Sequence, residues 1–398
     1  MGKRIAIASC YDKYNYGSLL QSFALQQVIE GFQCDVVTLD KSGLSSEIRA
    51  GRRSYYRQNL FNMSLYRAKM GFAAHRIRQK VDKGFGACMR QRYGEFRNFS
   101  DCHIKLSPQT RSFRELASFC SDFDAVVVGS DQLWLPVNIA GGYYTLSFVD
   151  APVRKVSYAT SFGVSDLPAR YLRLAGEFLE SFDAVSVREE TGSCIVKNAT
   201  GRAAEVVCDP TMLLTKEEWC SVKALDYRVP SEPYILCYFM GTNIWNRYCA
   251  EVLARNRGCK ILAIVHPDEY VAFDEKYANY KPYDVGPAQF LQLVSHAKYI
   301  CTDSFHGTVF ATLFNKQFFS FRRHENLGSQ STNSRLDTLL SRLGLESRLC
   351  ESVGEFDSAC CEDVDFDRVN AKVESFRLES LAWLRTSLGI EEPFDDMH

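Results

Sequence analysis

The sequence predicts an α/β protein of two Rossmann-like domains that are joined by a linker and face each other across a cleft. Three observations support this class. Apolar, β-prone segments alternate with segments of helical periodicity in both halves of the chain. Several apolar segments are continuous, which is typical of parallel strands that are buried on both faces. A charged segment that ends between two prolines separates the halves.

Composition limits the classes of protein to which the chain can belong. With 398 residues, 46% of them hydrophobic, the chain is long enough for two domains with their own cores. A formal net charge of -1 argues against a general nucleic-acid-binding protein. The fifteen cysteines include no Cys-x-x-Cys pair, so we expect reduced thiols, no metal site and a cytoplasmic protein. We find neither a signal peptide nor an apolar run of about 20 residues that could span a membrane.

The first half begins with a β-loop-α-β unit. Residues 3–9 form an apolar strand, helical periodicity follows Gly17, and 34–39 form the next strand. The pattern then resumes beyond residue 100. Its further predicted elements are helix 113–119, strand 124–129, strand 156–160, helix 168–182, strand 184–187 and strand 205–207.

The second half follows a linker at 216–233. Its predicted elements are strand 234–240, helix 244–255, strand 260–265, helix 287–296, strand 299–301, helix 307–314, strand 317–321 and a long amphipathic helix over 366–388. The chain therefore divides into an N-terminal domain (1–220), a C-terminal domain (221–364) and a final helical segment (365–398). We expect this last segment to pack back on the N-terminal domain.

A basic helical insertion, 49–100, interrupts the first domain. Between residues 49 and 92 there are twelve Lys or Arg and one acid, Asp82, with aromatic residues interleaved. One interpretation is a solvated helical insertion. The other is a surface that meets anionic lipid or a diphosphate-linked acceptor. Nucleic acid is a weaker alternative, because the rest of the chain offers no matching basic face.

Two polar motifs follow predicted strands of the N-terminal domain. Residues 15–18, Asn-Tyr-Gly-Ser, stand where a strand feeds a helix, so free backbone N–H groups there favour an anion or a sugar oxygen. A capped turn would give the same pattern. Residues 128–134, Val-Gly-Ser-Asp-Gln-Leu-Trp, offer Asp and Gln for sugar hydroxyls and a Trp face for a sugar ring. The alternative is an Asp helix cap beside a core Trp.

Two further positions carry charge or a titratable ring. Arg188 ends a strand that we predict to be buried, where a cation needs an anion; a ligand or the neighbouring glutamates could supply it. His306 lies at a strand-to-helix junction, which favours an acid/base role over a core histidine. Asp303 or Ser304 could orient its ring. His266 and His324 are weaker candidates.

The ordered motifs resemble those of bacterial polysaccharide pyruvyltransferases. They are residues 15–21, 128–134, 157–163, 187–190, 209–211 and 302–308, so the resemblance covers about residues 1–345. It implies a GT-B-like arrangement of the two domains, phosphoenolpyruvate as the donor with no further cofactor, and a sugar of a cell-surface polysaccharide precursor as the acceptor. The product would carry pyruvate as a cyclic ketal.

The resemblance also assigns roles to residues. Arg188 and His306 match the Arg and His that family members place around phosphoenolpyruvate. Some members have an Arg where this chain has Ser304, so another cation, from Arg322, Arg323 or Arg335, is needed. The predicted site comprises catalytic His306 and Asp303; donor-binding Arg188, Ser304, Gly307, Thr308 and Arg335; and acceptor-binding Asn15, Tyr16, Gly17, Ser130, Asp131, Gln132 and Trp134.

Two other functions fit the same architecture. One is a sugar-nucleotide-dependent GT-B glycosyltransferase, although no base-and-ribose site is evident. The other is a non-catalytic glycan-binding regulator. A membrane-surface acceptor would place the protein peripherally on the inner face of the membrane, with the 49–92 segment as the contact. The resemblance to polysaccharide pyruvyltransferases further implies that the C-terminal domain (221–364) binds the donor.

Overall fold

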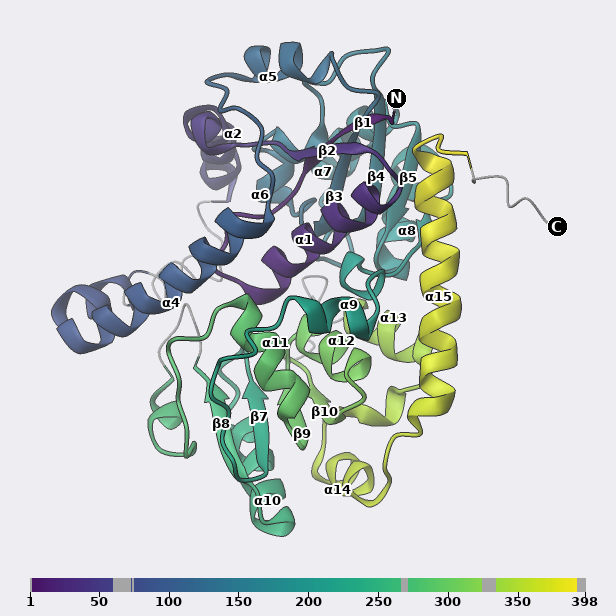
Figure 1. Ribbon diagram of the computed structural model, residues 1–398. Helices are drawn as coiled ribbons and strands as arrows, with labels where there is room; N and C mark the ends of the chain where they lie inside the picture. The colour runs from purple at the N-terminus through teal and green to yellow at the C-terminus, as the bar shows by residue number, and fades with distance from the viewer. Residues whose placement is uncertain (1, 60–72, 74, 266–270, 324–333, 392–398) are drawn as a thin grey trace.

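Two parallel β-sheets form the centres of two domains in the computed structural model, which describes residues 2–59, 73, 75–265, 271–323 and 334–391 (Figure 1). The N-terminal sheet has the strand order β2-β1-β3-β4-β5-β6, and the C-terminal sheet has the order β11-β10-β9-β7-β8. Every strand pair is parallel. The prediction of two Rossmann-like α/β domains is therefore confirmed.

The strands are short and largely buried, as continuous apolar segments predict. In the central strand β3, Val126, Val127 and Val128 are fully buried. The bounds are β1 Arg4–Ala8, β2 Asp35–Thr38, β3 Ala125–Asp131, β4 Arg154–Thr160, β5 Ala184–Val187, β6 Glu205–Val206, β7 Tyr234–Tyr238, β8 Lys260–Ile264, β9 Tyr299–Thr302, β10 Gln317–Phe321 and β11 Leu349–Cys350. The predicted domain boundary after residue 220 falls between β6 and β7.

Helices surround both sheets. They are α1 Tyr16–Gly31, α2 Ser45–Gln58, α4 Lys83–His103, α5 Phe113–Cys120, α6 Pro136–Ile139, α7 Ala169–Leu179, α8 Glu190–Thr200, α9 Lys216–Ser221, α10 Ile244–Arg257, α11 Pro287–His296, α12 Phe305–Leu313, α13 Ser334–Leu343, α14 Val353–Cys361 and α15 Phe366–Ser387. Local sequence explains several of their ends. Asn15 caps the start of α1, Ser304 caps α12, and Gly258 ends α10 in the left-handed conformation.

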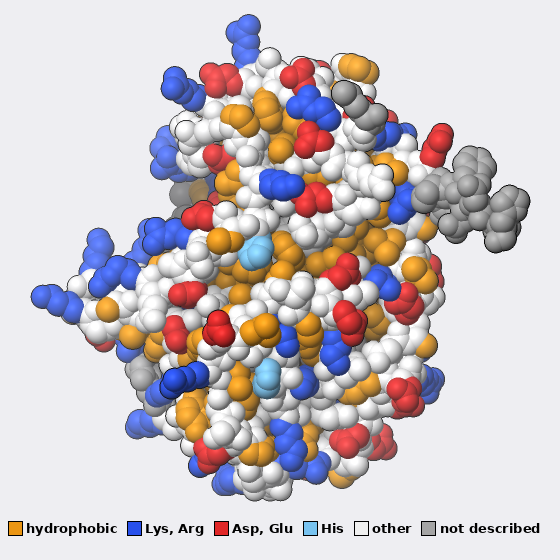
Figure 2. All heavy atoms as spheres, viewed as in Figure 1, with side chains coloured by type: hydrophobic (Ala, Val, Ile, Leu, Met, Phe, Trp, Pro, Cys, Tyr) orange, Lys and Arg blue, Asp and Glu red, His pale blue; other side chains and the backbone are white. Residues whose placement is uncertain are grey.

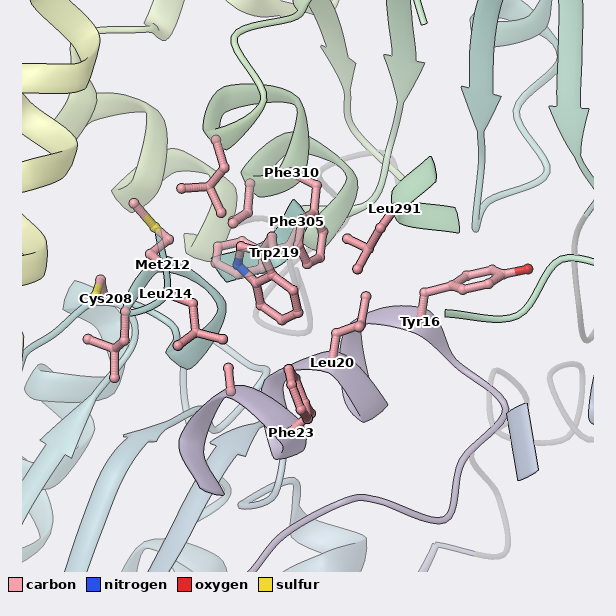
Figure 3. Packing of buried hydrophobic residues seen from close by; sticks show 14 of the residues in the cluster. Tyr16, Leu20, Phe23, Cys208, Met212, Leu214, Trp219, Leu291, Phe305 and Phe310 are labelled. Carbon is pink, nitrogen blue, oxygen red and sulfur yellow. The ribbon is translucent and has the colours of Figure 1, made fainter. Parts of the chain in front are cut away.

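The two domains share one continuous apolar core. The start of α1 packs across the boundary, where the ring of Tyr16 stacks on Phe290 at 4.7 Å and its hydroxyl donates to the carbonyl of Val285. Figure 3 shows part of the surrounding core, with Tyr16, Leu20 and Phe23 on α1 and with Trp219, Leu291, Phe305 and Phe310 among the residues of the same cluster. Apolar packing of this extent fixes the two domains relative to each other.

The basic insertion also joins the domains. Arg92 on α4 is buried, and its guanidinium donates to the carbonyls of Val265 and Pro282 at 2.9 and 3.2 Å. Glu95 on the same helix accepts from Gln289 of α11 at 2.8 Å. Neither interpretation of the insertion anticipated this contact, because charge pattern alone does not reveal a buried arginine. Part of the insertion, 60–72 and 74, lies outside the described residues.

The outer end of the insertion is different. It projects from the body at the left of Figure 1, and Figure 2 shows basic side chains gathered on it. Arg76, Lys80, Lys83 and Arg90 are exposed there. The described part of the chain contains no helix that is both long and apolar enough to cross a membrane.

Helix α15 spans both domains (Figure 1). Its predicted amphipathic pattern requires a long apolar surface to pack against, and the two domains together provide one. Ser380 accepts a hydrogen bond from the backbone N–H of Cys208 at 2.9 Å, and Trp383 packs against Tyr158. These contacts are with the N-terminal domain. The helix also packs against α12 and α13, so it bridges the domains instead of covering one of them.

Candidate active site

The main candidate site is a cavity of about 480 Å³ between the two domains. It lies at the carboxyl ends of β1, β3 and β9, where parallel α/β sheets bind ligands. Both domains contribute, so the predicted cleft and the GT-B-like arrangement are confirmed. The lining residues are Asp12, Lys13, Tyr14, Asn15, Ser18, Asp131, Gln132, Ser304, Phe305, His306, Arg323 and Arg335.

Buried opposite charges form the base of this site. Arg188, with 1% of its side chain exposed, donates to Asp209 Oδ2 at 2.6 Å and to Asp131 Oδ1 at 3.4 Å. Asp209 also accepts from the N–H and hydroxyl of Thr211. Asp131 accepts from the Ser18 hydroxyl at 2.6 Å and has the left-handed φ of 82°, a strained conformation that is common at functional sites. Arg188 therefore fixes both carboxylates.

These interactions keep both carboxylates ionised. Burial alone would raise the pKa of Asp131, but the charges of Arg188 and His306 lower it well below its usual value. Burial likewise opposes ionisation of Asp209, and its pKa is held low by His306, by Arg188 and by the hydrogen bond from Thr211. The site thus presents fixed negative charge to the imidazole of His306.

His306 lies in the first turn of α12, at the position that the sequence predicted. Its Nε2 is 3.6 Å from Asp209 Oδ2, and 8% of its side chain is exposed. The start of α1 lies against the opposite edge of the ring, because a Cβ on Gly17 would come within 2.0 Å of Nδ1. Asp209 and His306 therefore form a carboxylate–imidazole pair next to the cavity.

The other residues of the 302–308 motif mainly shape the backbone. Ser304 lines the cavity and caps α12, accepting from the N–H of Gly307 at 3.3 Å. Thr308 bonds to the Ser304 carbonyl and to Ser320, away from the cavity lining. A Cβ on Gly307 would come within 2.3 Å of Thr302 Oγ1, so glycine there permits close packing. Of these three predicted donor residues, the structure brings only Ser304 to the cavity.

The predicted catalytic role of Asp303 does not fit its position. Its buried carboxylate accepts from the backbone N–H groups of Met240 and Gly241 at 2.6 and 2.9 Å and is absent from the cavity lining. Burial raises the pKa of Asp303, with Arg323 and the two N–H groups opposing the rise. Asp303 ties β9 to the loop after β7, and Asp209 is the carboxylate beside His306.

Four predicted acceptor residues are also buried instead of lining the cavity. Gly17 packs against the His306 ring, and Tyr16 belongs to the interdomain core. Trp134 is fully buried, donates to the Tyr144 carbonyl and packs on Phe162 and Phe178, so it offers no sugar platform. The Ser130 hydroxyl donates to the Ala159 carbonyl and also lies within hydrogen-bond distance of Asp209 Oδ2. Asn15, Asp131 and Gln132 do line the cavity.

Four arginines were predicted to bind the donor or to replace the missing cation, and the structure separates their roles. Arg335 and Arg323 line the cavity, whereas Arg322 is bound to Glu351 and Asp337. Arg188 lies behind the cavity lining. Burial, with the neighbouring charge of Arg188, lowers the pKa of Arg335 to about 9, so its positive charge is incompletely balanced.

Several buried donor atoms of this region have no hydrogen-bond partner within the described part of the chain. On residues that line the cavity they are Gln132 Nε2, Arg323 Nε and Arg335 Nε. Buried polar atoms are normally paired, so a cluster of unpaired donors indicates space for a ligand that supplies acceptors. All three atoms are N–H donors, which favours an anionic ligand.

Sequence reasoning missed three contributors. Asp209 belongs to the 209–211 motif but was given no role, although its place after the predicted strand 205–207 was an available signal. Asp12 and Lys13 precede the first motif and carried no distinguishing pattern. His266 and His324 lie outside the described residues. No group of three or more His, Cys, Asp or Glu side chains among the described residues could hold a metal ion.

Fold and site define a two-domain α/β protein with an anion-adapted cavity between its domains. A family model described as polysaccharide pyruvyl transferase matches residues 15–325, which include every predicted site residue except Arg335. The chain belongs to the polysaccharide pyruvyl transferase family. No curated protein sequence matches it.

Three of the solved structures that match the chain are remote from it in sequence. The spinosyn forosaminyltransferase SpnP has 12% identity and a TM-score of 0.44, covering 98% of this chain and 100% of its own. UDP-GlcNAc 2-epimerase from Methanocaldococcus jannaschii has 12% identity and a TM-score of 0.48, covering 96% and 99%. MurG from Acinetobacter baumannii has 9% identity and a TM-score of 0.45, covering 98% and 99%.

Proposed function

We propose that this transferase moves the enolpyruvyl unit of phosphoenolpyruvate onto two hydroxyls of a sugar in a cell-surface polysaccharide precursor, forming a pyruvate ketal. The observation that carries the proposal is the cluster of unpaired buried donors at the interdomain cavity. Phosphoenolpyruvate carries about three negative charges, from one carboxylate and one phosphate, so it would satisfy several of these donors at once.

The donor would bind between Arg335, Arg323 and Lys13. All three line the cavity, and Arg335 and Arg323 have unpaired Nε atoms. Guanidinium groups bind carboxylates and phosphates through paired hydrogen bonds, which suits a donor with both groups. Arg188 would act at one remove, by holding Asp131 and Asp209 in place.

The chemistry requires one acid/base group that works twice. The acid gives a proton to the methylene carbon of phosphoenolpyruvate, which becomes a methyl group, and the adjacent carbon becomes oxocarbenium-like. The first sugar hydroxyl attacks this carbon and returns a proton to the same group. The second hydroxyl displaces phosphate, which leaves with that hydroxyl's proton. A positioned acid/base group contributes about 10²–10⁴ in rate to such steps.

His306 is the proposed acid/base group, and Asp209 is its partner. The ionised carboxylate of Asp209 is 3.6 Å from Nε2, where it would orient the ring for proton transfer. Asn15, Asp131 and Gln132 would orient the acceptor, because each lines the cavity on the N-terminal side. The Gln132 amide retains an unpaired N–H donor for a hydroxyl oxygen.

One assay separates this function from its two alternatives. The protein is incubated with phosphoenolpyruvate and a panel of aryl glycosides, and phosphate release and the product mass are measured. Phosphate release with the mass gain of a pyruvate ketal is the expected result. Turnover only with a sugar nucleotide would support a glycosyltransferase instead. Binding of glycans without turnover of either donor would support a regulator.

We also propose that the protein works at the inner face of a membrane through the outer end of the insertion. Exposed Arg76, Lys80, Lys83 and Arg90 there stand beside Ile77 and Val81, which are 61% and 78% exposed. We expect binding to anionic liposomes that weakens between about 0.05 and 0.5 M salt, since surface charge is screened. Equal binding to neutral liposomes would contradict this proposal.

A further inference from the structure

A second cavity, of about 350 Å³, adjoins the first. Asp12 and Lys13 line both cavities, so the two sites share a wall. The second cavity lies wholly in the N-terminal domain, beside α2 and the loop after β2. A molecule whose sugar occupies the first cavity could therefore extend into the second.

The second cavity is strongly basic. Its lining has four cations, Lys13, Lys41, Arg49 and Arg52, and one acid, Asp12. Asp12 is already paired with Lys41 at 2.6 Å. Arg49 and Arg52 have no carboxylate within 4.0 Å in the part of the chain that the structure describes. Subtracting one acid from four cations leaves three unbalanced positive charges, which suits a multiply charged anion.

Neutral groups hold the side chains of Arg49 and Arg52 in place. Arg52 Nη2 donates to Asn138 Oδ1 at 2.7 Å, and its buried Nε has no partner. Arg49 Nε donates to the Ser45 carbonyl at 2.8 Å. The cations are thus oriented without being neutralised, which preserves their attraction for an added anion.

We propose that the second cavity binds a phosphate or diphosphate group attached to the acceptor sugar. The inference rests on the proposed function, because it assumes that the acceptor sugar lies in the first cavity. It defines the acceptor class as a sugar phosphate or sugar diphosphate. A lipid carrier or a nucleotide could supply that group, and both present the same chemistry to Arg49 and Arg52.

Kinetics of a double variant, Arg49→Gln with Arg52→Gln, test the acceptor class. We expect the ratio of kcat/KM for a diphosphate-linked sugar to that for the matching neutral glycoside to fall about tenfold or more, as loss of charged hydrogen bonds predicts. The control Arg114→Gln, an exposed change on α5 outside both cavities, should keep the ratio. An unchanged ratio in the double variant would overturn the proposal. Comparing lipid-linked and nucleotide-linked sugars identifies the source.

A binding measurement keeps this inference separate from the proposed function. Inorganic diphosphate is titrated into the full chain by calorimetry, with phosphoenolpyruvate present to occupy the first cavity. We expect its Kd to rise about tenfold or more in the double variant, with thermal unfolding confirming that the variant folds. Equal affinity in wild type and variant would overturn the second site, even if transfer activity is found. A clear difference would support it even if phosphoenolpyruvate proves not to be the donor.

Discussion

Asp209 links the charged residues of the site to the stability of the fold. It is fully buried and bonds to Arg188, so Asp209→Asn would leave that guanidinium with less compensation. We expect the free energy of unfolding to fall by about 3 kcal/mol, as for other broken buried pairs. Urea titration measures the change. Asp337→Asn, which alters an exposed partner of Arg322, should cost about 1 kcal/mol or less. Equal losses in the two variants would contradict this account.

The same residue predicts a pH dependence. Because the folded-state pKa of Asp209 is lowered, its contribution to stability is fully present above about pH 4, the ordinary carboxyl value. The contribution is lost as the pH falls below that value toward the folded-state pKa. Wild type should therefore lose stability more steeply below about pH 4 than Asp209→Asn. Parallel stability curves would show that Asp209 is not ionised in the folded protein.

Arg335 should contribute to donor affinity. Its guanidinium lines the cavity with its charge incompletely balanced. We expect Arg335→Gln to raise the KM for phosphoenolpyruvate about 10- to 100-fold, the equivalent of one or two charged hydrogen bonds. The neighbouring Arg322 is held by Glu351 and Asp337 outside the cavity, so Arg322→Gln should change this KM little. Similar effects of the two variants would remove Arg335 from the donor site.

Residue roles were predictable from sequence only where position determines exposure. His306 lines the cavity, as its position suggests, because strand-to-helix junctions of parallel sheets open onto ligand sites. Trp134 and Tyr16 occur in similar junctions, yet their large rings turn into the core. Packing with residues distant in the sequence decides that direction, and a local motif does not contain this information.

At the scale of elements, the contact between α1 and α12 positions the imidazole. A Cβ on Gly17 would come within 2.0 Å of His306 Nδ1, so Gly17→Ala must displace the ring or the helix. We expect turnover to fall about tenfold or more, since small misplacements of a catalytic group are costly. In α4, Gly94→Ala meets no atom within 4 Å and should add about 0.5–1 kcal/mol of stability. Normal turnover by Gly17→Ala would contradict the proposed ring position.

Elements with strong periodicity were predicted closely. The predicted bounds of α11 and β10 coincide with those observed, and those of most strands differ by one or two residues. The helices α8, α13 and α14 and the short strand β11 were not predicted. Helix α13 repeats Leu336, Leu339, Leu340 and Leu343 at helical spacing, a pattern that was overlooked. The sequences of α8, α14 and β11 are polar or brief, so their helical or extended form depends on packing against neighbours.

At the scale of the whole molecule, the arrangement of domains followed from the sequence, but their contacts did not. Continuous apolar strands predicted two parallel sheets, and hence a cleft at the strand ends. Arg92 reaching the carbonyls of Val265 and Pro282, and α15 bridging both domains, depend on residues far apart in the chain. These contacts fix the cavity in which Arg335 and His306 meet.

The measurement that tests the central claim most directly compares wild type with His306→Ala under saturating phosphoenolpyruvate and a glycan acceptor. Phosphate release and ketal mass give turnover, while calorimetry gives the Kd for phosphoenolpyruvate and thermal unfolding checks the fold. We predict that turnover falls about 10²–10⁴-fold while the protein stays folded and still binds the donor. Near-normal turnover by a folded His306→Ala protein would contradict the assignment of His306 as the acid/base group.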